Sequence, residues 1–124
     1  MIKIFLADDH VFVREGLKKF LNSEIDIEVV GEASDAHGTM EFFNSSTCDI
    51  ALLDISLPGK DGLDLLKELS ENGHDVKVIF LTMHPEKIFA ERAFNLGAWG
   101  YLTKESDPGE LLDAIYKVNS GRKY

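Results

Sequence analysis

The stretch Ile50-Ala51-Leu52-Leu53-Asp54 decides the fold, because it is a short apolar run without alternation that ends in an acid. A strand that is apolar at every position is typical of a parallel sheet that helices cover on both faces. Val78-Ile79-Phe80-Leu81-Thr82 has the same character and ends in a hydroxyl side chain. The two runs predict a buried parallel sheet with polar side chains at the ends of its strands.

Further runs of strand character alternate with stretches of helical periodicity on both sides of Ile50–Asp54. Short connections between alternating strands and helices favour right-handed crossovers and a doubly wound sheet. The predicted class is therefore α/β, a doubly wound five-stranded parallel sheet flanked by five helices. The predicted strands are Ile2–Ala7, Ile27–Ala33, Asp49–Asp54, Val76–Thr82 and Trp99–Leu102.

Residues at the ends of the helical stretches are suited to start or stop a helix. Asp61 and Asp107 suit the N-cap position, and Pro108 fits the first turn that follows Asp107. Gly73 and Gly97 stand where a residue of left-handed conformation closes a helix. These signals predict a third helix between Asp61 and Gly73, a fourth that ends at Gly97 and a fifth that starts after Asp107.

Apolar stripes predict the helix faces that are buried. The first helix, Val11–Asn22, has a clear stripe, whereas the second, Ala36–Asn44, has a weak one. The fourth helix is predicted to have Pro85 in its first turn. Its core-facing side chains are expected to be Phe89, Ala93 and Leu96.

Length and composition limit the possible functions. The 124 residues suit one domain, and 44% hydrophobic with 28% charged residues is typical of a globular protein. No apolar run is long enough to span a membrane, and the lone cysteine, Cys48, is expected to be a packing residue of a cytoplasmic chain. The net charge of −9 argues against a nucleic-acid or anionic-membrane surface on this chain.

Charged and hydroxyl side chains follow the ends of the predicted strands. In a doubly wound sheet, ligands bind beyond the carboxyl ends of the strands, where the strand order reverses. In the order 2-1-3-4-5, Asp8 and Asp9 after the first strand and Asp54 after the third converge, with Thr82 and Lys104 on the far wall. Singly, each has a structural explanation, as a helix cap or a solvated charge; together they predict a site.

The electrostatic repulsion between three convergent carboxylates must be offset, because two like charges about 4 Å apart repel by roughly 4 kcal/mol at an effective dielectric constant of 20. A raised pKa, a bound cation or Lys104 could supply it. Oxygen ligands with room for water favour Mg²⁺. Carboxylate, Mg²⁺, hydroxyl and ammonium are the parts of a phosphoryl-transfer site, in which Asp54 is the predicted nucleophile and forms an aspartyl phosphate.

Over its whole length the chain resembles the receiver domain of two-component response regulators, which has a flavodoxin-like fold. The resemblance rests on Asp8-Asp9, on Asp54 with the following segment 55–62, on Thr82 and on Gly100–Lys104. Leu6–His10, Val13–Leu17 and Leu81–His84 are similar to the LuxR/NarL-type subfamily of transcription regulators.

The resemblance implies a role for each matching residue. Asp54 would accept a phosphoryl group from the phosphohistidine of a sensor histidine kinase. Asp9, Asp54 and the backbone carbonyl of Ser56 would bind Mg²⁺, and Asp8 would act through water. Thr82 and Lys104 would contact the phosphoryl oxygens. Tyr101 would act with Thr82 as the switch, its ring swinging inward as Thr82 shifts.

The same resemblance implies what phosphorylation controls. The movement would alter the face formed by the fourth helix, fifth strand and fifth helix, and would favour a homodimer or release an output domain. The polar and basic ending, residues 119–124, is typical of the start of a linker. Residues 1–124 are therefore expected to be the receiver domain of a longer regulator, whose helix-turn-helix output domain binds DNA.

Two positions depart from the family's usual pattern. Glu105 follows Lys104 where many receivers have proline, and this peptide bond is expected to be trans because a non-proline cis bond costs about 2.5–4 kcal/mol. Met83 is bulkier than the small residue that often follows the threonine. We expect Met83 to slow the attack of water on the phosphoryl group, with Ser56 and His84 as further candidates for tuning its lifetime.

Alternatives remain open at this point. A haloacid-dehalogenase-like phosphatase also uses a strand-end aspartate, but its second aspartate two positions later is here Ser56. A stand-alone or phosphorylation-independent receiver module is the other alternative. The histidines lack zinc-site spacing, and Trp99 is expected to be partly buried or to anchor a partner.

Overall fold

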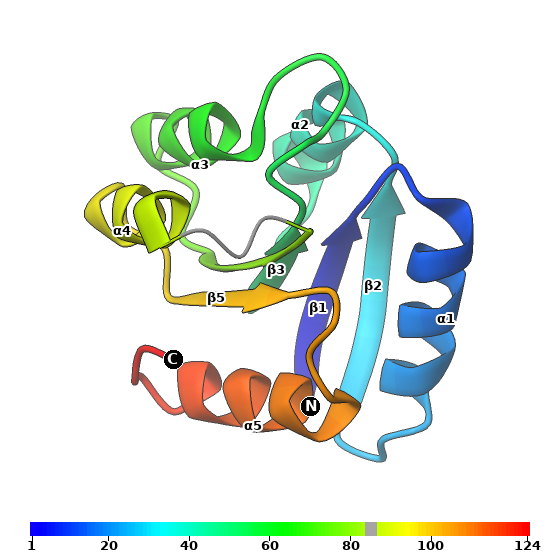
Figure 1. Ribbon diagram of the computed structural model, residues 1–124. Helices are drawn as coiled ribbons and strands as arrows, with labels where there is room; N and C mark the ends of the chain where they lie inside the picture. The colour runs from blue at the N-terminus through cyan, green and yellow to red at the C-terminus, as the bar shows by residue number, and fades with distance from the viewer. Residues whose placement is uncertain (84–86) are drawn as a thin grey trace.

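The described residues form one parallel sheet of five strands in the order β2-β1-β3-β4-β5 (Figure 1). The structure is a computed structural model, and it describes residues 1–83 and 87–124. The order reverses between β1 and β3, so the sheet is doubly wound as predicted. The strands are β1 (Ile2–Ala7), β2 (Ile27–Ala33), β3 (Ile50–Leu53), β4 (Lys77–Thr82) and β5 (Gly100–Thr103).

Helices cover both faces of the sheet (Figure 1). Core side chains from α2, α3 and α4 pack on one face, and those from α1 and α5 pack on the other. This arrangement explains why β3 and β4 are apolar without alternation. The helices are α1 (Val11–Asn22), α2 (Ala36–Ser45), α3 (Gly62–Glu71), α4 (Lys87–Asn95) and α5 (Pro108–Asn119).

Strand register brings the polar strand ends together. Ala7, the last residue of β1, lies opposite Leu53, the last residue of β3. The next backbone amide, that of Asp54, donates to the carbonyl of Ala7 at 3.1 Å. Asp8 and Asp54 therefore leave neighbouring strands at the same edge of the sheet.

Most of the predicted helix signals are confirmed. The Asp61 side chain accepts a hydrogen bond from the Asp64 amide at 3.0 Å, and that of Asp107 accepts one from the Gly109 amide at 2.9 Å. Gly73 and Gly97 have φ angles of 78° and 104°. The helices that these four residues bound begin and end where the sequence predicts.

The weakly patterned helix α2 also forms. Its N-cap, Asp35, accepts a hydrogen bond from the Gly38 amide at 2.7 Å. Phe42 and Phe43 place their rings 4.5 Å and 5.5 Å from that of Phe5. A cap and an aromatic cluster thus anchor a helix whose apolar stripe is weak.

One predicted core residue is wrong. Leu96 is 36% exposed, because α4 ends at Asn95 and the chain turns away at Gly97 instead of continuing the stripe. Ala93 is fully buried and Phe89 partly buried, as predicted. Pro85 lies outside the described residues.

Two further predictions concern single side chains. Cys48 is buried, and burial raises the pKa of its thiol to about 12, which fits a packing role. Trp99 is partly buried, with the ammonium groups of Lys77 and Lys123 at 5.1 Å and 5.9 Å from its ring centre.

Within the described ranges, every helix is too short or too polar to cross a membrane.

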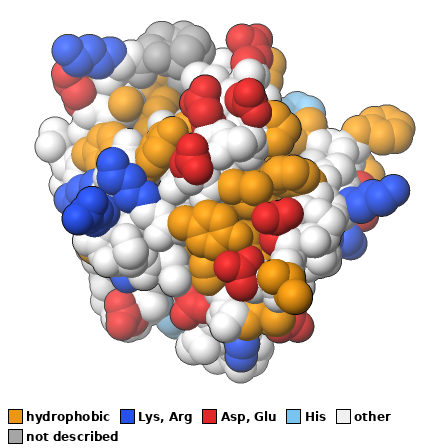
Figure 2. All heavy atoms as spheres, turned by 90° about the horizontal axis from the view of Figure 1, so that it is seen from below, with side chains coloured by type: hydrophobic (Ala, Val, Ile, Leu, Met, Phe, Trp, Pro, Cys, Tyr) orange, Lys and Arg blue, Asp and Glu red, His pale blue; other side chains and the backbone are white. Residues whose placement is uncertain are grey.

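Acidic side chains also lie on the surface of the protein. Figure 2 shows the lower face, which includes α5, with acidic side chains among hydrophobic ones. Asp8 and Asp54, by contrast, are buried where β1 and β3 end.

Candidate functional site

The site is a cluster of charged side chains at the carboxyl edge of β1, β3 and β5. Asp8 and Asp54 are buried, with 4% and 2% of their surface exposed. Asp9 is more open, with 36% of its side chain exposed. The sequence prediction that three carboxylates converge beside Lys104 is confirmed in position.

Lys104 joins the two buried acids. Its Nζ lies 2.7 Å from Asp8 Oδ2 and 2.7 Å from Asp54 Oδ2, and only 6% of its side chain is exposed. Burial alone would lower the pKa of Lys104, but hydrogen bonds to Asp54 and Asp8 outweigh it and raise the pKa above its usual value. Lys104 is therefore a charged ammonium at neutral pH, and it partly neutralises the cluster.

The loop after β3 holds the carboxylate of Asp54. The Ser56 amide donates to Asp54 Oδ1 at 3.0 Å, and the Gly62 amide donates to the Ile55 carbonyl at 2.6 Å. A Cβ on Gly62 would lie 2.5 Å from the Asp54 carbonyl oxygen, closer than side chains can approach. Gly62 is thus required for the path of this loop, a role that the sequence analysis missed.

Thr82 ends β4 at full burial, and its carbonyl accepts a hydrogen bond from the Lys104 amide at 2.7 Å. This bond fixes the start of the loop that carries Lys104, whose peptide bond to Glu105 is trans as expected. Tyr101 on β5 is half-buried, with its ring 6.5 Å from that of Phe80. Thr82 ends β4 and Lys104 directly follows β5, so both stand at the carboxyl ends of neighbouring strands.

The residues expected to tune the lifetime differ in position. Met83 directly follows Thr82 and is 58% exposed, and Ser56 is also exposed. His84 lies outside the described residues.

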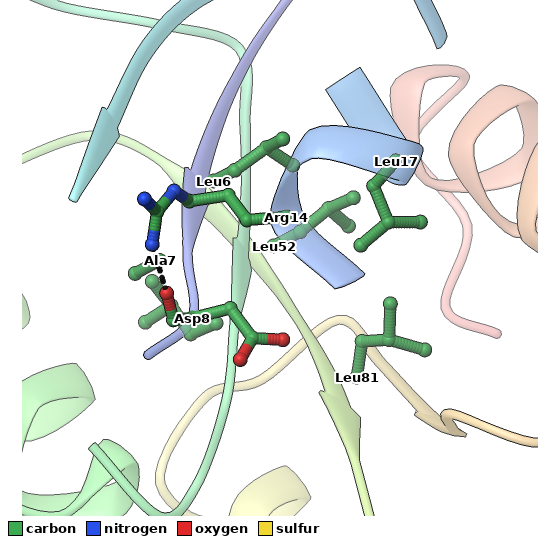
Figure 3. A pocket seen from close by; sticks show the side chains of 8 residues that line it. Leu6, Ala7, Asp8, Arg14, Leu17, Leu52 and Leu81 are labelled. Carbon is green, nitrogen blue, oxygen red and sulfur yellow. Dashed lines mark hydrogen bonds between the residues drawn. The ribbon is translucent and has the colours of Figure 1, made fainter. Parts of the chain in front are cut away.

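Arg14 on α1 contacts the backbone of Asp8, as Figure 3 shows. Its Nη1 donates to the backbone carbonyl of Asp8 at 2.6 Å, and its Nε donates to Glu32 Oε1 at 3.1 Å. Only 13% of the Arg14 side chain is exposed. Neither contact can be predicted from sequence periodicity, and in the sequence Arg14 belongs only to the segment Val13–Leu17 that carries the resemblance.

His10 also reaches the cluster. Its Nδ1 lies 2.9 Å from Asp8 Oδ1 and 3.0 Å from Lys104 Nζ. The side chains of Asp8, Asp9, His10 and Asp54 each offer one ligand atom, all within 4.8 Å of one another. Three carboxylates on one side of a half-open site fit a hard divalent cation such as Mg²⁺.

The doubly wound sheet has successive acids, a further acid, a buried hydroxyl and a lysine at its carboxyl edge, which is the arrangement that the resemblance to receiver domains implies. A sequence profile described as "Response regulator receiver domain" matches residues 4–116, and the chain belongs to this family. Within the family it is of the LuxR/NarL type, as the relatives below bear out.

The chain is 38% identical to the response regulator UvrY of Escherichia coli (strain K12), over 100% of this chain and 57% of UvrY. It is 37% identical to the transcriptional regulatory protein DesR of Bacillus subtilis (strain 168), over 99% of this chain and 61% of DesR. A solved LuxR-family response regulator from Aurantimonas sp. SI85-9A1 superimposes with a TM-score of 0.94 at 36% identity, covering 99% of this chain and 88% of that one. The chain thus spans somewhat more than half the length of these two sequence relatives.

Proposed function

We propose that this chain is a phosphorylation-activated switch that accepts a phosphoryl group on Asp54 from a sensor histidine kinase. The observation that carries the proposal is the buried Asp54 carboxylate, held 2.7 Å from Lys104 and beside Asp8. The ammonium of Lys104 can offset negative charge on the transferring oxygens, and a cation held by the neighbouring acids would offset more of it.

The transfer is a displacement at phosphorus. A carboxylate oxygen of Asp54 attacks the phosphorus of the kinase's phosphohistidine, and the P–N bond breaks with its electrons returning to the imidazole. Lys104 and the Thr82 hydroxyl contact the phosphoryl oxygens as negative charge is redistributed. The catalysis that the chain supplies is that of its own phosphorylation and dephosphorylation.

Asp9, Asp54 and the backbone carbonyl of Ser56 would hold Mg²⁺, with Asp8 acting through water. When bound there, Mg²⁺ would supply positive charge that offsets the charge on the phosphoryl oxygens. The three carboxylates supply the oxygen ligands that this ion prefers.

Phosphorylation adds a charge of about −1.5 to −2 at the edge of β3. Thr82 ends β4, the strand beside β3, and Tyr101 lies on β5, the strand beyond it; the two side chains would shift together. The resulting change on the face of α4, β5 and α5 would favour a homodimer and control an output domain.

Residues 1–124 would then be the receiver part of a longer cytoplasmic regulator of transcription. The greater length of UvrY and DesR supports an output domain, and DesR is named as a transcriptional regulatory protein. The net charge of −9 supports DNA contact through that output domain and not through this chain.

Intact-mass measurement after incubation with Mg²⁺ and acetyl phosphate tests the proposal. The wild-type chain should gain one phosphoryl group, and Asp54→Asn should gain none. Absence of the adduct on the wild type, with or without a kinase, would overturn the switch. Rapid turnover of varied phosphomonoesters would instead favour a phosphatase.

A further inference from the structure

A four-residue turn carries Lys104 between the end of β5 and the start of α5. The turn consists of Thr103, Lys104, Glu105 and Ser106. The Ser106 amide closes it by donating to the Thr103 carbonyl at 3.0 Å, which places Lys104 at the second position. Thr103, the first residue of the turn, is the register partner of Thr82 on β4. The turn therefore starts beside the hydroxyl residue of the site.

The covalent chain does little to fix this turn. Neither of its central residues, Lys104 and Glu105, is proline or glycine, so no ring sets a φ angle there. Side chains add a restraint, because Thr103 Oγ1 and Ser106 Oγ lie 3.4 Å apart and both residues are half-buried. This contact is long for two hydroxyls, so it reinforces the backbone bond between the same two residues and does not replace it.

The helix that follows holds the far side of the turn. Asp107 comes directly after Ser106 and caps α5, with its side chain accepting a hydrogen bond from the Gly109 amide at 2.9 Å. Side chains of α5 and β5 pack in the same core. The hydroxyl pair of Thr103 and Ser106 thus joins the end of a strand to the start of a capped helix.

The position of the turn matters because the Lys104 ammonium contacts two carboxylates at once. Its Nζ lies 2.7 Å from Asp8 Oδ2 and 2.7 Å from Asp54 Oδ2. The lysine stem is flexible, but it can keep both contacts only while its backbone stays at a fixed place relative to β1 and β3. A shift of the turn would therefore move the ammonium away from the group that it must contact.

We propose that Thr103 and Ser106 are positioning residues for Lys104, whose ammonium their hydroxyl pair holds in place for phosphoryl transfer to Asp54. The inference rests on the proposed function, in which Lys104 contacts the transferring oxygens. In this role neither hydroxyl touches the reacting atoms. Both act through the backbone of the turn.

Two substitutions remove the contact from opposite sides. Ser106→Ala deletes one hydroxyl, and Thr103→Val deletes the other while keeping a β-branched side chain on β5. Ser106→Thr is the conservative variant, because it keeps a hydroxyl at this position. The matched control is Ser120→Ala, which removes a hydroxyl that donates to the Lys117 carbonyl at the other end of α5. Intact mass gives the rate of phosphorylation by acetyl phosphate with Mg²⁺.

Ser106→Ala and Thr103→Val should each slow the phosphorylation of Asp54 about three- to tenfold. A displacement of about 1 Å can cost about 100-fold, and a turn that keeps its backbone hydrogen bond moves less than that. The double variant should be no slower than the slower single variant, since both substitutions remove the same contact. Ser106→Thr should recover most of the rate, and Ser120→Ala should match the wild type.

A second readout does not depend on phosphorylation. The nitrogen NMR signal of a lysine ammonium is sharp only when its protons exchange slowly with water. The signal of Lys104, identified by its loss in Lys104→Gln, should be sharp in the wild type and in Ser106→Thr and broadened in Ser106→Ala.

Three results would overturn the positioning role. They are additive effects of Ser106→Ala and Thr103→Val on the rate, an equal loss of rate in Ser106→Thr, and a Lys104 signal in Ser106→Ala as sharp as in the wild type. Each of them leaves the proposed function intact if the wild type is phosphorylated. A wild type that gains no phosphoryl group contradicts the proposed function itself.

Discussion

Lys104 and Asp54 are joined by a 2.7 Å hydrogen bond although 50 residues separate them in the chain. The bond crosses the carboxyl edge of the sheet from the end of β5 to the end of β3, passing the end of β4. The parallel order therefore brings together the ammonium and the carboxylate on which the proposed function depends.

The first prediction concerns this pair. Lys104→Gln should lower the free energy of unfolding by about 3 kcal/mol, because it leaves Asp8 and Asp54 buried without a counter-charge. Lys87→Gln, on the exposed side of α4, should change it by less than about 0.5 kcal/mol. Urea unfolding measures both. Adding Asp54→Asn to Lys104→Gln should recover part of the loss, and strictly additive effects would show that the two groups are not coupled.

The second prediction is the pH dependence of the same interaction. The pKa of Lys104 is raised in the folded chain, so its contribution to the free energy of unfolding is fully present below the unfolded pKa of about 10.4. The contribution is lost as the pH rises through the higher folded pKa. The stability difference between the wild type and Lys104→Gln should stay constant from pH 8 to about 9.5 and shrink above about pH 10.4. A difference that shrinks between pH 8 and 9 would contradict the raised pKa.

Sequence patterns predicted the backbone of this site better than its side-chain support. The bounds of β1, β2 and α1 agree with prediction, because the apolar patterns that favour a strand or a helix depend on residues close together in the sequence. Asp8, Asp54, Thr82 and Lys104 were located because parallel strands end at one edge. The side-chain contacts of Arg14 and His10 with the cluster were not predicted, because they depend on how α1 packs.

The third prediction tests Arg14 as a positioning residue for Asp8. Arg14→Gln should weaken Mg²⁺ binding severalfold and lower the free energy of unfolding by about 1–3 kcal/mol, because the Asp8 carbonyl and Glu32 lose a half-buried charged donor. Lys18→Gln is the matched control, since Lys18 also pairs with Glu32 while its other ion pair is with Glu15 and not with Asp8. It should lower the free energy of unfolding less than Arg14→Gln does and leave the Mg²⁺ affinity unchanged. Equal effects of the two variants on Mg²⁺ affinity would refute the positioning role.

The fourth prediction concerns the loop that carries Asp54. Gly62→Ala should destabilise the fold by about 2 kcal/mol or more and slow phosphorylation by acetyl phosphate, since the new Cβ would meet the Asp54 carbonyl oxygen at 2.5 Å and the Ile55 Cα at 2.8 Å. Gly16→Ala is the control, because a Cβ there meets nothing within 4 Å and alanine favours the helix by about 1 kcal/mol. The melting temperature should fall in Gly62→Ala and rise in Gly16→Ala.

The last prediction addresses the lifetime of the phosphorylated state. Met83 follows Thr82 directly and keeps 58% of its surface exposed. We expect its side chain to limit the approach of water to the phosphoryl group. If it slows attack on the aspartyl phosphate, Met83→Ala should shorten the half-life of the adduct severalfold while leaving the mass gained at saturation unchanged. Ile88→Ala, which removes another exposed apolar side chain at 63% exposure from α4, should leave the half-life as it is. The decay of the phosphorylated mass peak after removal of the phosphodonor gives the rates, and an unchanged half-life in Met83→Ala would leave Ser56 and His84 as the residues to test for this control.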